Sequence, residues 1–283
     1  MMHKLKYVIT NALFALSLLS NHSNATTQDS DARTQSIKAS NPIAFATKVI
    51  ADEMYLPGQN GAPDLSELQL NLVAPYPLTE KVNLINKVKL PWDTRPNDNG
   101  TETALGKVNY QAFFSQATPM KFGSDSEVSF GIGPSVSFNT SQFDTTMFGD
   151  NTTQAGISGL AFAKSGGFTG IAGYQKLWAV SGDDLDTQSI QLVAGYTWNN
   201  GFSVNMAPYL SQTGEEDWYI PVGLGVGQFF KLGGKVPMKV IANAYYNAKV
   251  PDRMGDDHQW QFQLGVIIMA PSIFGIPLGP IPH

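Results

Sequence analysis

The stretch HQWQFQLGVIIMAP, residues 258–271, alternates apolar and polar side chains over its first half. A row of apolar side chains that begins at Trp260 shares one parity, and Gln259, Gln261 and Gln263 share the other. Alternation with a period of two is typical of a strand whose two faces meet different surroundings. In a soluble sheet the apolar face would cover a core. In a membrane barrel it would face lipid, and the glutamines would line the interior.

The composition of the 283-residue chain favours the barrel. Charged residues make up 14% of the sequence, well below the roughly 25% of soluble domains. Outside the N-terminal segment there is no apolar run near the roughly 18 residues that a membrane-spanning helix needs. The chain has no cysteine, and a closed barrel, which has no open sheet edge, does not need disulfides. The formal net charge of −5, without a basic cluster, argues against nucleic-acid binding.

The N-terminus has the layout of a secretory signal peptide. Lys4 and Lys6 precede an apolar run over residues 7–19, and Ser23-Asn24-Ala25 places small residues at the positions expected for cleavage. We therefore predict a signal peptide over residues 1–25 and export of the mature chain.

The remainder divides into a leader, a strand-rich region and a tail. Residues 26–41 are polar and patternless, which predicts a flexible periplasmic leader, and residues 272–283 form a C-terminal tail. Between them, Gly, Asn, Asp and Pro clusters separate strand-like segments over residues 42–271. The twelve predicted segments are 43–54, 65–75, 81–91, 106–116, 127–138, 154–164, 168–180, 187–198, 201–212, 217–230, 236–248 and 259–270.

The polar faces and the connections indicate which kind of sheet this is. The polar faces carry Ser, Gly, Asn and Gln rather than the Lys and Glu of a solvated surface. Short turns such as 164–167 and 199–201 alternate with longer, acidic connections such as 92–106 and 139–154. Aromatic residues at segment ends suit the girdles at two membrane interfaces; they are Trp92, Trp178, Trp198, Trp218 and Trp260. The sequence predicts an all-β fold, an up-and-down antiparallel transmembrane β-barrel of about twelve strands.

Several stretches also resemble a family of outer-membrane transporters that is usually labelled "meta-pathway of phenol degradation". In the C-terminal half they are LWAVSGDDLDTQSIQLVAGYTW (177–198), IPVGLGVGQFFKLGGKVPMKVIANAYYN (220–247) and QWQFQLGVIIMAP (259–271). In the N-terminal half they are NPIAF (41–45) and LNLVAPYPLTEKVNLINKVKLP (70–91). The resemblance implies an outer-membrane β-barrel and a transport function, and it leaves the substrate open.

The inward parity predicts the lining of the barrel. Amides and phenols dominate it, together with three lysines, which suits neutral or weakly anionic small molecules, and tyrosines could stack on aromatic rings. The predicted lumen-lining residues are Lys87, Lys89, Gln111, Gln191, Asn205, Tyr209, Lys239, Asn243, Tyr245, Gln259, Gln261 and Gln263. A barrel of twelve strands lies between filled barrels of eight and open channels of 16–18, so the lumen could be open or filled.

Catalytic and metal chemistry have little support. After signal removal only His258 and His283 remain as histidines, and no serine lies near His258 in the sequence, as a lipid hydrolase would need. We therefore predict no catalytic residues and no cofactor. Acidic clusters on the long connections could attract divalent cations, but their spacing matches no known ligand loop. The weak metal candidates are Asp183, Asp184, Asp186, Asp256 and Asp257.

The sequence thus predicts a passive channel in the outer membrane of a Gram-negative bacterium. Its solutes would be small neutral or weakly anionic molecules, aromatic ones among them, and its surroundings would be outer-membrane lipid and lipopolysaccharide. The alternative is a non-conducting structural barrel or a lipid-modifying enzyme of the outer membrane. A continuous water-filled lumen would favour the channel, and an inward Ser–His pair would favour the enzyme.

Overall fold

The computed structural model describes most of the chain after residue 27. The signal peptide over residues 1–25 lies outside the described residues and stays a prediction. The described residues are 28–97, 100–143, 151–182, 185–234, 236–251, 258–269, 272–273 and 276–277.

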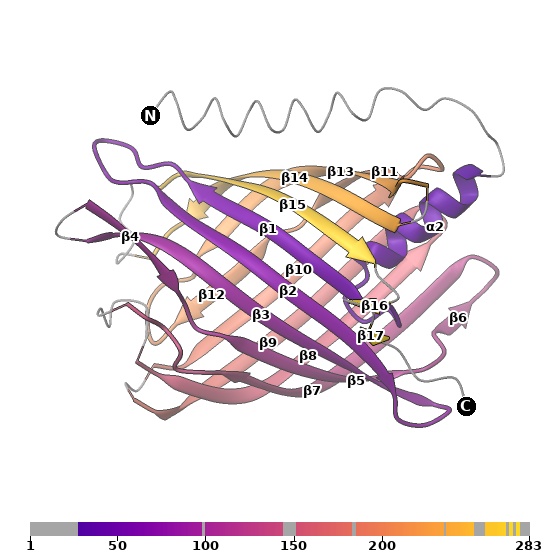
Figure 1. The fold of residues 1–283 in the computed structure, drawn as a ribbon, viewed down its shortest axis with the longest axis horizontal. Helices are drawn as coiled ribbons and strands as arrows, with labels where there is room; N and C mark the ends of the chain where they lie inside the picture. The colour runs from indigo at the N-terminus through magenta and orange to yellow at the C-terminus, as the bar shows by residue number, and fades with distance from the viewer. Residues whose placement is uncertain are drawn as a thin grey trace.

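Twelve antiparallel strands close into one barrel, as predicted (Figure 1). The first wall strand pairs with the last, and the two halves of an interrupted strand, β11 and β12, both pair with β10. The wall strands are β1 (Lys48–Leu56), β2 (Leu65–Pro77), β3 (Val82–Asn97), β5 (Asn109–Gln116), β7 (Ser126–Ser137), β8 (Thr153–Ser165), β9 (Phe168–Ser181), β10 (Thr187–Thr197), β11 (Phe202–Met206) with β12 (Tyr209–Thr213), β13 (Ile220–Leu232), β14 (Val236–Lys249) and β15 (Trp260–Met269).

Four shorter strands are not part of the twelve. β4 (Gly100–Leu105) pairs with β3, and β6 (Met120–Phe122) pairs with β7, so both extend the wall at its rims. β16 (Ser272–Ile273) and β17 (Ile276–Pro277) pair with each other within the predicted tail.

The glutamine stretch has the two faces that its alternation predicts. Trp260 and Phe262 on β15 are exposed on the outside of the wall, by 44% and 36%, whereas Gln261 between them is 5% exposed. On the neighbouring strand β1, Asp52 accepts a hydrogen bond from Gln263, so this parity points into the barrel. A wall with apolar residues outside and amides inside is that of a barrel in lipid.

The two ends of the barrel differ in their connections. At one end lie short turns, including 166–167 and 198–201, in which Gly166 and Gly201 adopt positive φ angles of 56° and 81°. A left-handed conformation of this kind is accessible to glycine without strain. We call this the short-turn end, and we call the opposite end, with connections such as 57–64 and 214–219, the long-loop end.

The prediction of a flexible leader over residues 26–41 is wrong for most of that segment. Gln28–Ser40 form helix α2, which lies at the short-turn end against β10, β11, β13, β14 and β15 (Figure 1). The apolar stripe that usually marks a packed helix is short here: Ile37 and Ala39 are buried, and the buried Ser36 beside them is hydrogen-bonded to Gly201. No helix among the described residues is long and apolar enough to cross a bilayer.

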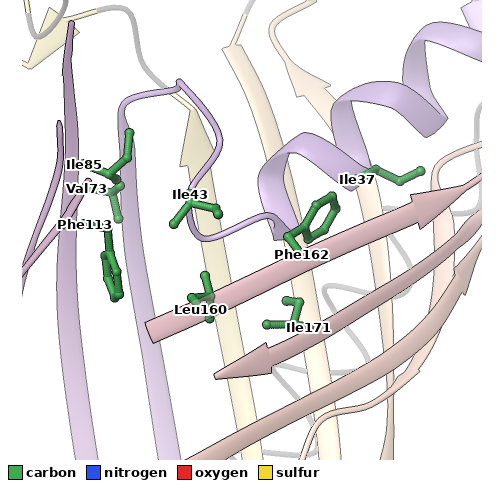
Figure 2. Packing of buried hydrophobic residues seen from close by; sticks show 8 residues of the cluster. All are labelled: Ile37, Ile43, Val73, Ile85, Phe113, Leu160, Phe162 and Ile171. Atoms are coloured by element: carbon green, nitrogen blue, oxygen red, sulfur yellow. The ribbon is translucent and has the colours of Figure 1, made fainter. Parts of the chain in front are cut away.

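The apolar core lies inside the barrel, at the short-turn end. Ile37 of α2 and Ile43 of the following segment cluster with inward side chains from β2, β3, β5, β8 and β9 (Figure 2). The wall residues of this cluster are Val73, Ile85, Phe113, Leu160, Phe162 and Ile171. Alternation alone did not predict these inward apolar residues, which fill the lumen at this end together with α2.

Candidate functional site

All the predicted lumen-lining residues except Gln259 lie on the inward face of the wall. An inward polar belt at mid-barrel joins β1, β2, β14 and β15. Asp52 Oδ1 accepts a hydrogen bond from Gln263 Nε2 at 2.9 Å, and Asn243 Nδ2 donates to Gln263 Oε1 at 2.7 Å. Asn71 Nδ2 lies 3.5 Å from the other oxygen of Asp52. A buried carboxylate is tolerated here because amide groups satisfy it.

The belt continues from β2 to β3 with an ion pair. Lys89 Nζ on β3 lies 2.7 Å from Glu67 Oε1 on β2, and their side chains keep 29% and 27% of their exposure. Across the barrel on β12, Tyr209 is paired in register with Gln191 and also faces the lumen. Tyr209 is 48% exposed and donates a hydrogen bond to Ser189 on β10. Water therefore reaches inward-facing side chains at mid-barrel.

Glycines shape the lumen along β13, which adjoins β14 of the belt. An added Cβ at Gly225 would lie 1.6 Å from Asn243 Oδ1, and one at Gly227 would lie 2.8 Å from Lys239 Cε. Glycine occupies these two inward positions of β13 because neighbouring polar side chains fill the space where a larger side chain would lie. On the other side of the barrel, Gln111 Nε2 donates to Ser158 Oγ at 3.3 Å.

Helix α2 closes the short-turn end through polar contacts. Lys48 Nζ donates hydrogen bonds to the carbonyls of Ala39, at 3.2 Å, and Asn41, and Lys48 is 1% exposed. Lys239 Nζ donates to Ser40 Oγ at 2.8 Å. Two ammonium groups thus meet the C-terminal end of the helix, where its last carbonyls are unpaired and its dipole favours positive charge.

Two further contacts hold α2 at the rim, one near its start and one in its second half. Ser36 Oγ donates to the carbonyl of Gly201 at 3.2 Å, and Asp31 pairs with Lys231 at 2.7 Å. The hydrogen bond from Lys231 holds the pKa of the Asp31 carboxyl below its ordinary value of 3.8. We call residues 28–47, the helix and the segment leading to β1, the plug.

Three of the remaining predicted lining residues lie near the long-loop end. Tyr245 is buried and donates to the carbonyl of Ala207 at 3.2 Å, next to the break between β11 and β12. Gln261 is hydrogen-bonded to the hydroxyl of Tyr219. Gln259 is exposed, one residue before β15. Gln191 and Asn205 also lie on inward faces of the wall. In the strand register, Gln191 is opposite Gly173 and Tyr209, and Asn205 is opposite Gly225.

His258 lies in the mouth at the long-loop end. It is 5% exposed, and its Nε2 lies 3.1 Å from the carbonyl oxygen of Pro63. Its own carbonyl accepts a hydrogen bond from Asn247 at 2.6 Å. These contacts join the connections after β1 and β14, so His258 has a structural position at the mouth. His283 lies outside the described residues.

The weak metal candidates are mostly outside the described residues, which include Asp186 but not Asp183, Asp184, Asp256 or Asp257. Asp186 accepts a hydrogen bond from the backbone N–H of Ala179 and lies 3.2 Å from Lys176 Nζ. Both contacts hold the pKa of its carboxyl below the ordinary value. Among the described residues no cluster of three or more His, Cys, Asp or Glu could hold a metal ion.

Sequence reasoning missed several charged residues of the interior, among them Lys48, Asp52 and Glu67. Lys48 and Asp52 share a parity in the segment KVIADEMYL, so the alternation carried a signal for them. Glu67 shares the parity of Gln69 and Asn71 on β2 in the same way. The plug had no comparable signal, because its contacts are to carbonyls and to lysines far away in the sequence.

Comparison with known proteins supports the fold. No protein-family model and no curated protein matches the chain. The COG4313 outer membrane channel from Pseudomonas putida F1 is similar in structure, with a TM-score of 0.57 and 13% identity over 81% of this chain and 99% of the channel. Outer membrane phospholipase A from Escherichia coli has a TM-score of 0.42 and 14% identity over 87% of this chain and 99% of its own. The similarity to the channel shows that the chain has the fold of a bacterial outer-membrane β-barrel.

Proposed function

We propose that the protein is a gated, passive channel of the Gram-negative outer membrane, without enzymatic activity. The observation that carries the proposal is the contrast within its interior. Side chains at mid-barrel, such as Tyr209 and Lys89, are accessible to water, whereas the short-turn end is filled by the plug. A solute that enters from the long-loop end would reach mid-barrel and would pass further when the plug moves. Outer-membrane lipid and lipopolysaccharide would surround the wall.

The lining favours small neutral or weakly anionic solutes, aromatic compounds among them. Lys87 and Lys89 share the belt with Asp52 and Glu67, so the charges of the belt balance. Deeper in the barrel, Lys48 and Lys239 are buried against the plug and would repel cations that approach it. The preference for anions over cations is therefore expected at the plug, and the belt itself would pass neutral phenols readily.

The plug is the step that limits passage in this proposal. Lys239→Met removes the hydrogen bond to Ser40 and weakens the contact at the C-terminal end of α2. A hydrogen bond to a charged group contributes about 1.5–3 kcal/mol, and about 1.4 kcal/mol corresponds to a tenfold change in an equilibrium. We expect swelling of proteoliposomes in phenol or benzoate to be about tenfold faster for the variant.

Swelling assays with matched solutes test the proposal. Phenol, benzoate and benzylamine are similar in size and differ in charge, and Lys121→Met at the exposed strand β6 is the control substitution. Entry in the order phenol, benzoate, benzylamine, accelerated by Lys239→Met and unchanged in the control, would support the channel. Swelling with none of the solutes in either variant would favour a structural barrel. Equal rates for all three solutes would refute the role of the lysines.

A further inference from the structure

A second polar site lies outside the lumen, on the rim of the short-turn end. A pocket of about 590 Å³ opens there between α2 and the turn that joins β10 to β11. The pocket is lined by Arg33, Tyr196, Trp198, Asn199, Asn200 and Phe202. None of these residues belongs to the lumen lining described above.

The aromatic wall of the pocket belongs to the outer surface of the barrel. The ring centroids of Tyr196 and Trp198 lie 4.9 Å apart, and those of Trp198 and Phe202 lie 5.5 Å apart. The cluster continues to Phe168, 4.7 Å from Tyr196, which is 65% exposed. Aromatic clusters at the end of a barrel strand mark the level of the lipid headgroups. One side of the pocket therefore lies where phospholipid phosphates are found.

Arg33 supplies the polar side of the pocket. The hydrogen bond from Ser36 to Gly201 places α2 against the β10–β11 turn. Arg33 Nε is buried and has no hydrogen-bond partner among the residues that the structure describes. A buried N–H without an acceptor is costly, and a guanidinium group fits a phosphate through two parallel hydrogen bonds. Because Arg33 lines the pocket, its guanidinium group offers donors to an anionic oxygen ligand there, beside a turn that leaves its Nε unpaired.

We propose that this pocket binds the phosphate group of a membrane phospholipid. Arg33 would donate to the phosphate oxygens, the exposed Asn199 would add a polar contact at the rim, and the acyl chains would descend along the aromatic wall. A phosphorylated soluble partner would leave the aromatic wall without a role. The site is independent of the proposed transport function. Because Arg33 belongs to α2, a bound lipid would also fasten the plug to the membrane leaflet at the short-turn end.

Native mass spectrometry of the detergent-solubilised full chain tests the site. The probes are a short-chain phosphatidylglycerol, the matching diacylglycerol without phosphate, and inorganic phosphate. We expect one phosphatidylglycerol to be retained, with at least tenfold weaker retention in Arg33→Ala and partial retention in Arg33→Lys, which keeps the charge but loses the planar group. Lys121→Ala, which removes a basic side chain at the same end outside the pocket, is the matched control.

Folding of each variant is checked by its heat-modifiable mobility on gels. Retention of phosphatidylglycerol but not of diacylglycerol, lost with Arg33 and kept in the control, supports the proposal. If inorganic phosphate binds with the same dependence on Arg33, the phosphate chemistry is supported and free phosphate competes for the site. Equal loss in Arg33→Ala and Lys121→Ala, or equal retention of diacylglycerol, overturns the proposal.

Discussion

The assignment of the two wall faces makes a quantitative prediction at Leu192, in the middle of β10. Its side chain is 46% exposed on the lipid face. Leu192 lies four residues from Tyr196 of the aromatic cluster, or about 10 Å along the membrane normal for a rise of about 3.4 Å and a tilt of about 40°. Since the apolar band is about 25 Å tall, Leu192 is near its midplane, where an arginine costs about 2–4 kcal/mol. We expect Leu192→Arg to lower the free energy of unfolding by that amount.

The neighbouring residue provides the control. Gln191 is paired in register with Gly173 on β9 and with Tyr209 on β12, on the lumen face. An arginine there would stay hydrated and could lie over the tyrosine ring, so Gln191→Arg should change the free energy of unfolding by less than about 1 kcal/mol. Urea titrations of both variants in lipid vesicles, followed by tryptophan fluorescence and heat-modifiable mobility, measure the difference. Equal destabilisation of the two variants would refute the assignment of the faces.

Three further predictions follow from individual contacts. Leu264→Arg should lower the free energy of unfolding by less than Leu192→Arg does, because Glu53 lies directly across on β1 and can pair with the arginine. Adding Glu53→Gln should bring the decrease to the value of Leu192→Arg in the same titration. Gly223→Ala should impair folding yield, since the added Cβ would lie 2.0 Å from the backbone carbonyl oxygen of Ala244 on the paired strand β14. The pKa of Asp31 is lowered in the folded chain, so its ion pair stabilises the plug above the unfolded pKa and is lost as the pH falls through the lowered value. Single-channel recordings should therefore show more openings below about pH 4. The Asp31→Asn variant should show these openings at neutral pH.

Most of the wall could be predicted from the sequence because each strand meets two different solvents. The predicted segments 168–180 and 187–198 correspond to β9 (Phe168–Ser181) and β10 (Thr187–Thr197). The prediction failed within 201–212, where the strand is interrupted between Met206 and Tyr209. Pro208 has no N–H to donate to a ladder, so the sequence contained a signal for the interruption.

The candidate site was predictable only in part, since parity assigns a face but not a partner. The inward faces of Gln263 and Asn243 follow from alternation within their own strands. Their hydrogen bonds to Asp52 and to each other depend on the register between β1, β14 and β15, which a single strand does not determine. Ion pairs and hydrogen bonds between distant segments, such as those of the plug, depend on the closed barrel itself.

The way in which the barrel closes explains how the plug could move without unfolding the protein. β1 pairs with β15, and β10 pairs with both β11 and β12, so the backbone hydrogen bonds of the wall form a closed ring without any contribution from α2. Release of α2 would therefore expose no sheet edge, which is the usual cost of removing an element from a β-sheet protein. Release would expose Lys48 and Lys239, whose ammonium groups would then be hydrated in the lumen, and also the inward apolar side chains that Ile37 and Ile43 cover. Displacement of the plug thus exchanges protein hydrogen bonds for water and gives up apolar burial on a wall that remains intact, and it creates a positively charged passage at the moment of opening.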